Sequence, residues 1–103
     1  MAQYEIFPNV GAKRDDIPFL LAIQNDHIVR YTGATVVVPL RANMDPVEVI
    51  APLIEVPGNG HYVLSAAEIL TIDSARLRHP VGILSLEDRA KIRPALDKVL
   101  GDY

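Results

Sequence analysis

The sequence contains no cysteine. Disulfide scaffolds and thiolate metal sites are therefore excluded, and such a composition suits a reducing compartment. The first residues lack the basic and apolar regions of a secretory signal peptide. The longest apolar run, residues 17–23, is far too short to span a membrane. We therefore expect a cytoplasmic protein with no membrane partner.

The chain also lacks an excess of positive charge. Its 10 Lys and Arg residues are opposed by 13 Asp and Glu residues, which gives a net charge of −3 and a pI of about 5.5. Proteins that bind nucleic acid by themselves usually carry a basic patch, and no cluster of Lys and Arg occurs along this sequence. We expect such an acidic protein to join DNA only through a basic partner.

Recognisable catalytic and metal-binding motifs are absent as well. Of the three histidines, His27, His61 and His79, none stands at metal-ligand spacing from another histidine or a carboxylate. The acidic pairs at 15–16 and 87–88 are adjacent in sequence, so their side chains do not share a face. No serine has the context of a nucleophile elbow, and no glycine pattern would cradle a phosphate. We therefore predict that the protein is not an enzyme and has neither a metal site nor a cofactor.

The sequence does contain an all-β pattern followed by one helix. With 103 residues, 50% of them hydrophobic, the chain can bury one core, and we expect a single domain over residues 1–103. Alternating, β-branched and apolar runs predict strands at residues 3–6, 17–23, 35–38, 53–56, 61–64, 68–72 and 81–84.

Four features refine this pattern. The Pro-Gly-Asn-Gly segment at residues 57–60 predicts a hairpin between the strands on either side of it. The apolar run at 17–23 predicts a strand covered on both faces, on one by the core and on the other by a further layer, for which a second subunit is one candidate. Pro39 should end the pairing of its strand or lie at a sheet edge. Residues 43–50 carry cap and proline signals for a helical turn.

The pattern changes at the C-terminal end. Ser85 and Asp88 stand where a capping box would begin a helix. Apolar residues then recur at the spacing of one helical face, in Ile92, Leu96 and Val99. Pro94 should kink or divide this helix, and Gly101 is suited to end it. Many short strands followed by one helix predict a small barrel or sandwich with the helix packed on it.

One side of this helix combines leucines with charged residues. On a helical wheel the side is formed by Leu86, Arg89, Arg93, Asp97 and Leu100. It is either an ordinary solvated surface or a partner-binding face that ends in Tyr103 beside a free carboxylate. Arg and Tyr are frequent anchors of protein interfaces, which favours the second interpretation.

Several segments, in their order along the chain, resemble the CcdB family of toxin–antitoxin modules. Residues 19–26, Phe-Leu-Leu-Ala-Ile-Gln-Asn-Asp, resemble the family's second strand and the polar residues after it. Within residues 32–40, Thr-Gly and then Val-Val-Val-Pro-Leu resemble its turn and its hydrophobic-Pro-Leu strand. Residues 83–85 leading into 92–96 resemble its last strand and helix. The similarity covers nearly the whole chain.

The resemblance implies a mainly β fold, an SH3-like antiparallel barrel with a C-terminal α-helix, which forms a homodimer. Family members are toxins that bind the A subunit of DNA gyrase and trap its complex with cleaved DNA. A CcdA-like antitoxin neutralises them through a disordered tail, and the toxin–antitoxin complex represses its own operon. Contact with operator DNA is made chiefly by the antitoxin, so this chain would reach DNA only indirectly.

The family's gyrase-contacting end is a Trp-Gly-Ile tripeptide, and this sequence departs from it. The chain has no tryptophan, so the large contact area of an indole is missing. The resemblance therefore implies a gyrase-binding set made of the chain end and two neighbours on the helix. These residues are Arg93, Asp97, Leu100, Gly101, Asp102 and Tyr103.

This departure leaves two alternatives open. The related MazF and Kid toxins share the expected fold and cut RNA, but they use a basic cleft formed across the dimer and an N-terminal Arg-Pro pattern that this sequence lacks. In the second alternative the toxic activity has decayed, and the protein only binds its antitoxin.

Overall fold

The strand-forming segments fold into one curved antiparallel sheet. The computed structural model describes residues 3–25 and 32–101. Its strands are β1 (Glu5–Pro8), β2 (Phe19–Ala22), β3 (Ala34–Arg41), β4 (Leu53–Val56), β5 (Gly60–Leu64), β6 (Leu70–Asp73) and β7 (Gly82–Ile83). Two short 3-10 helices, η1 (Ala66–Glu68) and η2 (Ser74–Arg76), follow β5 and β6, and the helices α2 (Leu86–Arg89) and α3 (Ile92–Leu100) follow β7. None of the described helices is long and apolar enough to cross a membrane.

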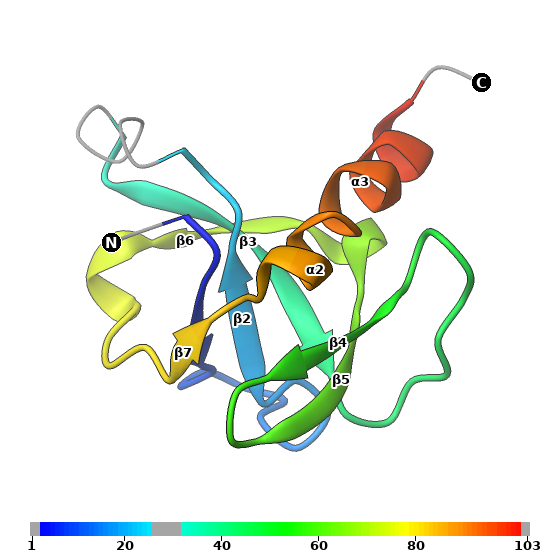
Figure 1. Cartoon of the computed structure of the whole chain (residues 1–103). Helices are drawn as coiled ribbons and strands as arrows, with labels where there is room; N and C mark the ends of the chain where they lie inside the picture. The colour runs from blue at the N-terminus through cyan, green and yellow to red at the C-terminus, as the bar shows by residue number, and fades with distance from the viewer. Residues whose placement is uncertain (1–2, 26–31, 102–103) are drawn as a thin grey trace.

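The sheet has the strand order β4-β5-β3-β2-β1-β7, and β6 also pairs with β3. It curls into a nearly closed barrel, with α2 lying in front of it and α3 leading away toward the C-terminal end (Figure 1). The predicted fold class, a mainly β antiparallel barrel with a C-terminal helix, is confirmed.

β3 is the central strand and continues through Pro39. One edge pairs with β2, while the other pairs with β6 over residues 34–37 and with β5 at residues 40–41. The Pro39 carbonyl accepts a hydrogen bond from the Ser65 N–H (3.0 Å) on this second edge. The N–H that a proline lacks would point to this same edge, into the gap between β6 and β5. Neither strand pairs with β3 at this position, so the proline removes no hydrogen bond between strands. Pro39 therefore interrupts the pairing of one edge only, because β3 remains paired with β2 on the other.

The predicted hairpin is formed by β4 and β5. Its register pairs Ile54 with Tyr62 and Val56 with Gly60. Gly58 and Gly60 have φ angles of 74° and 91°, which residues with a Cβ rarely adopt. The hairpin turn therefore requires glycine at both positions, and it leaves β4 as the last strand at one end of the sheet.

Buried side chains form two clusters, one on each face of β2. Leu21 lies in the main cluster, to which Ile92 and Ala95 of α3 also belong. The second cluster consists of Phe7, Leu20, Ala22, Val37 and Leu77. The chain itself thus covers both faces of β2. The prediction that both faces are covered is confirmed, but the cover of the second face is Leu77 and its neighbours rather than a second subunit.

Residues 43–50 form no helix. Val47 and Ala51 close a tight turn with two backbone hydrogen bonds, of 3.0 and 2.9 Å. Within this turn Val49 has a φ of 71°, an unfavourable conformation for a β-branched residue. The predicted helical turn is therefore wrong, because this segment has no apolar stripe that a helix could bury against the barrel.

Candidate functional site

The C-terminal segment begins with the predicted cap. The Ser85 hydroxyl accepts a hydrogen bond from the Asp88 N–H (3.1 Å), which satisfies one N–H of the first turn of α2. Pro94 lies in the first turn of α3, where a missing N–H costs no helical hydrogen bond. In one continuous helix its ring would clash with the Ala90 carbonyl. The prediction that Pro94 divides the helix is confirmed.

α3 packs on the barrel through one side. The side chains buried in the main cluster or packed against it are Ile92, Ala95, Leu96 and Val99. The predicted stripe is therefore confirmed, and Ala95, which is 0% exposed, is an additional member of it. α3 also contacts η1. The opposite side of the helix is exposed and faces away from the barrel.

Arg93, Asp97 and Leu100 lie together on this exposed side. Their i, i+4, i+7 spacing places them on one flank of α3, and the Leu100 side chain is 65% exposed. Gly101 ends the helix, with its N–H donating to the Asp97 carbonyl (2.7 Å). The structure thus places four of the predicted residues along one flank of α3, from Arg93 in its first turn to Leu100 and Gly101 at its end. The other two lie outside the described part of the chain: Asp102 and Tyr103.

Arg89 does not belong to this flank, contrary to the sequence-based grouping. Its Nε donates to the Leu84 carbonyl (2.9 Å), and its guanidinium lies 5.2 Å from the centre of the Tyr4 ring. Leu86 is 78% exposed but belongs to α2, a separate helix. A single helical wheel fails here because the break before α3 changes the helix direction.

Asp88 is a buried residue whose role the sequence analysis missed. It is 7% exposed, and its carboxylate accepts hydrogen bonds from the Glu55 N–H (2.9 Å) and from Lys91 Nζ (2.9 Å). Burial alone would raise the pKa of Asp88, but the bonds from Glu55 and Lys91 outweigh it, and the pKa lies below its usual value. The available signal was an Asp where a capping box usually carries Glu, since the shorter side chain bonds to the backbone of β4 instead of turning back to Ser85.

A groove of about 460 Å³ lies on the other flank of α3. It is lined by the turn at residues 46–49, by Pro52 and Leu53, and by Ala90, Lys91 and Pro94. The side chains of Val47, Val49 and Leu53 are 46%, 43% and 43% exposed. α3 therefore separates a flank with charged residues from an apolar groove.

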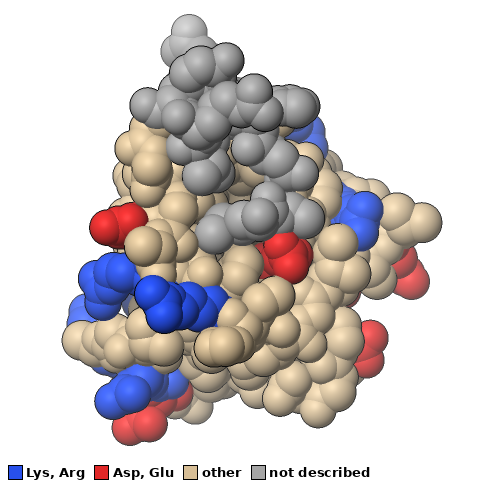
Figure 2. Space-filling model, turned by 90° about the vertical axis from the view of Figure 1, so that its left-hand side faces the viewer, with Lys and Arg blue, Asp and Glu red and all other residues tan. Residues whose placement is uncertain are grey.

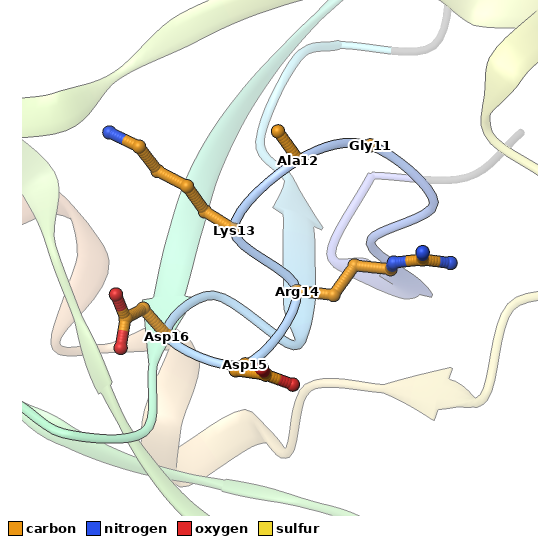
Figure 3. Close-up of a pocket in the computed structure, with 6 residues that line it drawn as sticks. All are labelled: Gly11, Ala12, Lys13, Arg14, Asp15 and Asp16. Atoms are coloured by element: carbon orange, nitrogen blue, oxygen red, sulfur yellow. The ribbon is translucent and has the colours of Figure 1, made fainter.

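A second hollow, of about 360 Å³, is lined by loop residues 11–16. The Asn9 side chain holds this loop with three hydrogen bonds to its backbone, 2.8–3.2 Å long. Figure 3 shows that Lys13 and Asp16 extend to one side of the loop and Arg14 to the other. These groups diverge, so the loop does not present the converging acid and base that catalysis requires.

A bidentate ion pair joins the end of β3 to η1. The Arg41 guanidinium donates to both carboxylate oxygens of Glu68, with Nη2 2.6 Å from Oε2, and the Ser65 hydroxyl donates to Oε1 (2.7 Å). The bonds from Arg41 and Ser65 lower the pKa of Glu68 to about 2, and the same pairing raises the pKa of Arg41. Glu68 is therefore ionised at neutral pH and has no proton to donate as a general acid.

The fold brings the 11–16 loop next to η2, although the two are far apart in the sequence. Gly11 lies beside η2, since a Cβ added to it would be 3.7 Å from Arg76 Nη2. Figure 2 shows Lys and Arg side chains collected along one side of the face that it draws, with Asp and Glu beside them.

Within residues 3–25 and 32–101, no group of three or more His, Asp or Glu side chains is placed to hold a metal ion. His27 lies outside the described residues.

Comparison with solved structures relates this fold to two endoribonucleases and to a MazE–MazF structure. An endoribonuclease in complex with its cognate antitoxin, from a mycobacterial species, has a TM-score of 0.78 and 20% identity, over 98% of this chain and 95% of that chain. Another mycobacterial endoribonuclease has a TM-score of 0.76 and 20% identity, over 98% and 91% of the two chains. MazE–MazF from Deinococcus radiodurans has a TM-score of 0.72 and 16% identity, over 98% and 95%. At these identities the similarity concerns the fold.

Comparison of the sequence identifies the family. No curated protein matches the sequence. A family model described as CcdB protein matches residues 3–101, which include every described strand and the helices α2 and α3. The resemblance to the CcdB family of toxins is therefore confirmed, and the chain belongs to the CcdB protein family.

Proposed function

We propose that this protein is the toxin of a type II toxin–antitoxin module and that it binds the A subunit of DNA gyrase. The observation that carries the proposal is the exposed flank of α3, where Arg93, Asp97 and Leu100 line one side of the helix up to its end at Gly101. The buried stripe packs α3 on the barrel, so the backbone that carries these side chains is already positioned before binding. This reduces the entropy lost on association. Membership of the CcdB family supports gyrase as the target.

The proposed action is binding alone, without catalysis by the toxin. The flank and the chain end insert into the open dimer interface of gyrase and hold the enzyme on cleaved DNA, so that religation and strand passage stall. Leu100 supplies apolar contact area, while Arg93 and Asp97 pair with polar groups of the target. Because the indole of the family's tripeptide is missing, Tyr103 must supply the aromatic contact, and we expect weaker binding.

We further propose that the protein is a single-domain cytoplasmic homodimer and that a CcdA-like antitoxin neutralises it. Two of the similar structures support an antitoxin partner, since one contains a cognate antitoxin and another is MazE–MazF. The net charge of −3 supports contact with operator DNA through the antitoxin rather than through this chain.

Overexpression followed by an assay for gyrase-dependent linear plasmid DNA tests this function. Wild type should produce linear plasmid, and Arg93→Glu should reduce it about tenfold, because a frequent interface anchor is replaced by the opposite charge. Deletion of residues 100–103 should leave a folded protein and abolish toxicity. Lys98→Glu is the matched control, since it makes the same charge change on the other flank of α3. Equal losses in the Arg93 and Lys98 variants, or a toxic truncation, would contradict the proposed surface.

The second candidate function is an endoribonuclease, and it is favoured by the endoribonucleases among the similar structures. The described residues give it little support, since Glu68 is ionised at neutral pH and cannot act there as a general acid, and the Lys13 and Arg14 side chains of the 11–16 loop extend to opposite sides. Cleavage of RNA by the purified protein, lost in Arg41→Ala or Glu68→Ala, would replace gyrase binding as the function. Normal growth on overexpression, together with tight antitoxin binding, would instead indicate a protein that only binds its antitoxin.

A further inference from the structure

Side chains fasten the joint between α2 and α3 to the edge of β4. The Asp88 carboxylate accepts hydrogen bonds from the Glu55 N–H (2.9 Å) and from Lys91 Nζ (2.9 Å). Lys91 Nζ also donates to the Leu53 carbonyl (3.0 Å). Two side chains of the joint therefore bind two backbone groups of one strand, and we refer to these contacts among Leu53, Glu55, Asp88 and Lys91 as the β4 clamp.

β4 offers these backbone groups because it is the last strand at its end of the sheet. The Pro52 carbonyl accepts a hydrogen bond from the Leu64 N–H of β5 (2.9 Å). Because backbone groups alternate in direction along a strand, those of Leu53 and Glu55 point away from the sheet. Such edge groups are otherwise open to pairing with another strand. The clamp thus covers part of a sheet edge while it holds the helices.

The helix backbone alone does not fix the direction of α3, because the helix is divided before Pro94. The direction depends on the packing of the stripe, Ile92, Ala95, Leu96 and Val99, against the main cluster and on the contacts of the joint. Figure 1 shows α3 running from this joint toward the C-terminal end. At the usual rise of a helix, the far end of α3 lies about 13 Å from the joint, so a rotation of about 15° would move it by about 3 Å.

We propose that Asp88 is a positioning residue, which sets the direction of α3 through the β4 clamp and so places Arg93, Asp97 and Leu100 for their target. The part of this inference that concerns the target rests on the proposed function, whereas the part that concerns the helix direction does not. Glu87 provides a matched control, since it is an exposed carboxylate in the same turn of α2.

Spin-label distances test the direction of α3. The chain has no cysteine, so Lys98→Cys on α3 and Thr71→Cys on β6 would carry the only two nitroxides. Asp88→Ala should broaden the distance distribution and shift it by about 3 Å, and Glu87→Ala should leave it unchanged. Asp88→Asn, which keeps an oxygen for the Glu55 N–H, should restore most of the wild-type distribution. Lys91→Met, which leaves the bond between Asp88 and Glu55 in place, should shift it in the same direction as Asp88→Ala.

Titration with the gyrase A subunit then tests the consequence for binding. Circular dichroism would verify that each variant is folded under the conditions of the titration. Asp88→Ala should bind about tenfold more weakly than wild type, and Glu87→Ala should bind equally well. Unchanged distances in both Asp88→Ala and Lys91→Met overturn the proposal, as do shifted distances with unchanged affinity. If wild type does not bind gyrase while the distances shift, the proposed function fails and the positioning of α3 by Asp88 is retained.

Discussion

At the scale of single residues, a few charged side chains join separate segments of the protein. Arg41 and Glu68 connect β3 with η1, Arg89 holds α2 to the carbonyl before it and to the Tyr4 ring, and Asp88 connects α2 with β4. In the described part of the chain, every buried side-chain nitrogen and oxygen has a hydrogen-bond partner. Groups that are fully occupied in this way stabilise the fold and are poorly available for acid–base chemistry.

The Arg41–Glu68 pair predicts a pH dependence of stability. The pKa of Glu68 is lowered from 4.5 to about 2, so its contribution is complete above pH 4.5 and declines as the pH falls toward 2. Because the Glu68 side chain is 41% exposed, solvent screening limits the contribution to about 1 kcal/mol. Glu68→Gln should therefore lower the free energy of unfolding in urea by about 1 kcal/mol near pH 7.

The difference between wild type and Glu68→Gln should shrink steadily below pH 4.5. Glu48→Gln, which changes an exposed carboxylate in the turn at residues 46–49, is the control and should have little effect at either pH. A difference that stays constant down to the most acidic measurement would show that the lost stability does not come from the ionised Glu68.

At the scale of secondary-structure elements, the sequence predicts structure well where the local turn chemistry decides it. The β4–β5 hairpin follows from its glycines, and the divided C-terminal helix follows from Ser85 and Pro94. The turn at residues 43–50 was mispredicted, because a local cap signal does not reveal whether a helix can bury a stripe there. The role of Asp88 was also hidden, since its partner on β4 is a backbone group, which leaves no pattern in the sequence.

For the candidate site, too, the sequence predicts what lies within one helix and misses what depends on tertiary contacts. The spacing of Arg93, Asp97 and Leu100 within one helix predicted their common flank. Arg89 was wrongly assigned to that flank, because the change of direction at the joint is a tertiary feature. The apolar groove on the other flank was not predicted at all, since it forms between α3 and a turn far away in sequence.

The cap of α2 leads to a prediction for this element. α2 has only four residues and therefore few hydrogen bonds of its own. The bond from the Asp88 N–H to the Ser85 hydroxyl thus contributes a large share of the hydrogen bonds that stabilise this helix. Ser85→Ala should lower the free energy of unfolding by about 1 kcal/mol, the usual cost of a lost N-cap. Ser85→Thr keeps the hydroxyl and should retain most of the stability. Chemical denaturation would test this, and equal stabilities of the Ala and Thr variants would contradict it.

At the scale of the whole molecule, the barrel completes its own interior. Side chains of one chain bury both faces of β2, with Leu21 in the main cluster and Leu20 in the second, each at most 4% exposed. The sequence could not show this, because the cover for the second face comes from Leu77, far along the chain. A strand that looks as if it needed a second subunit is therefore fully covered within the monomer.

The completeness of this interior predicts how the proposed homodimer should respond to dilution. Dissociation exposes no face of β2, so the separated chain keeps both buried clusters and should remain folded. Light scattering should show the mass falling from about twice 11.3 kDa to 11.3 kDa on dilution, while the far-ultraviolet circular dichroism per residue stays constant. In an obligate dimer the dichroism would be lost together with the mass, and the unfolding temperature would rise steeply with protein concentration. That result would mean that contacts between subunits, rather than the two clusters, hold the barrel together.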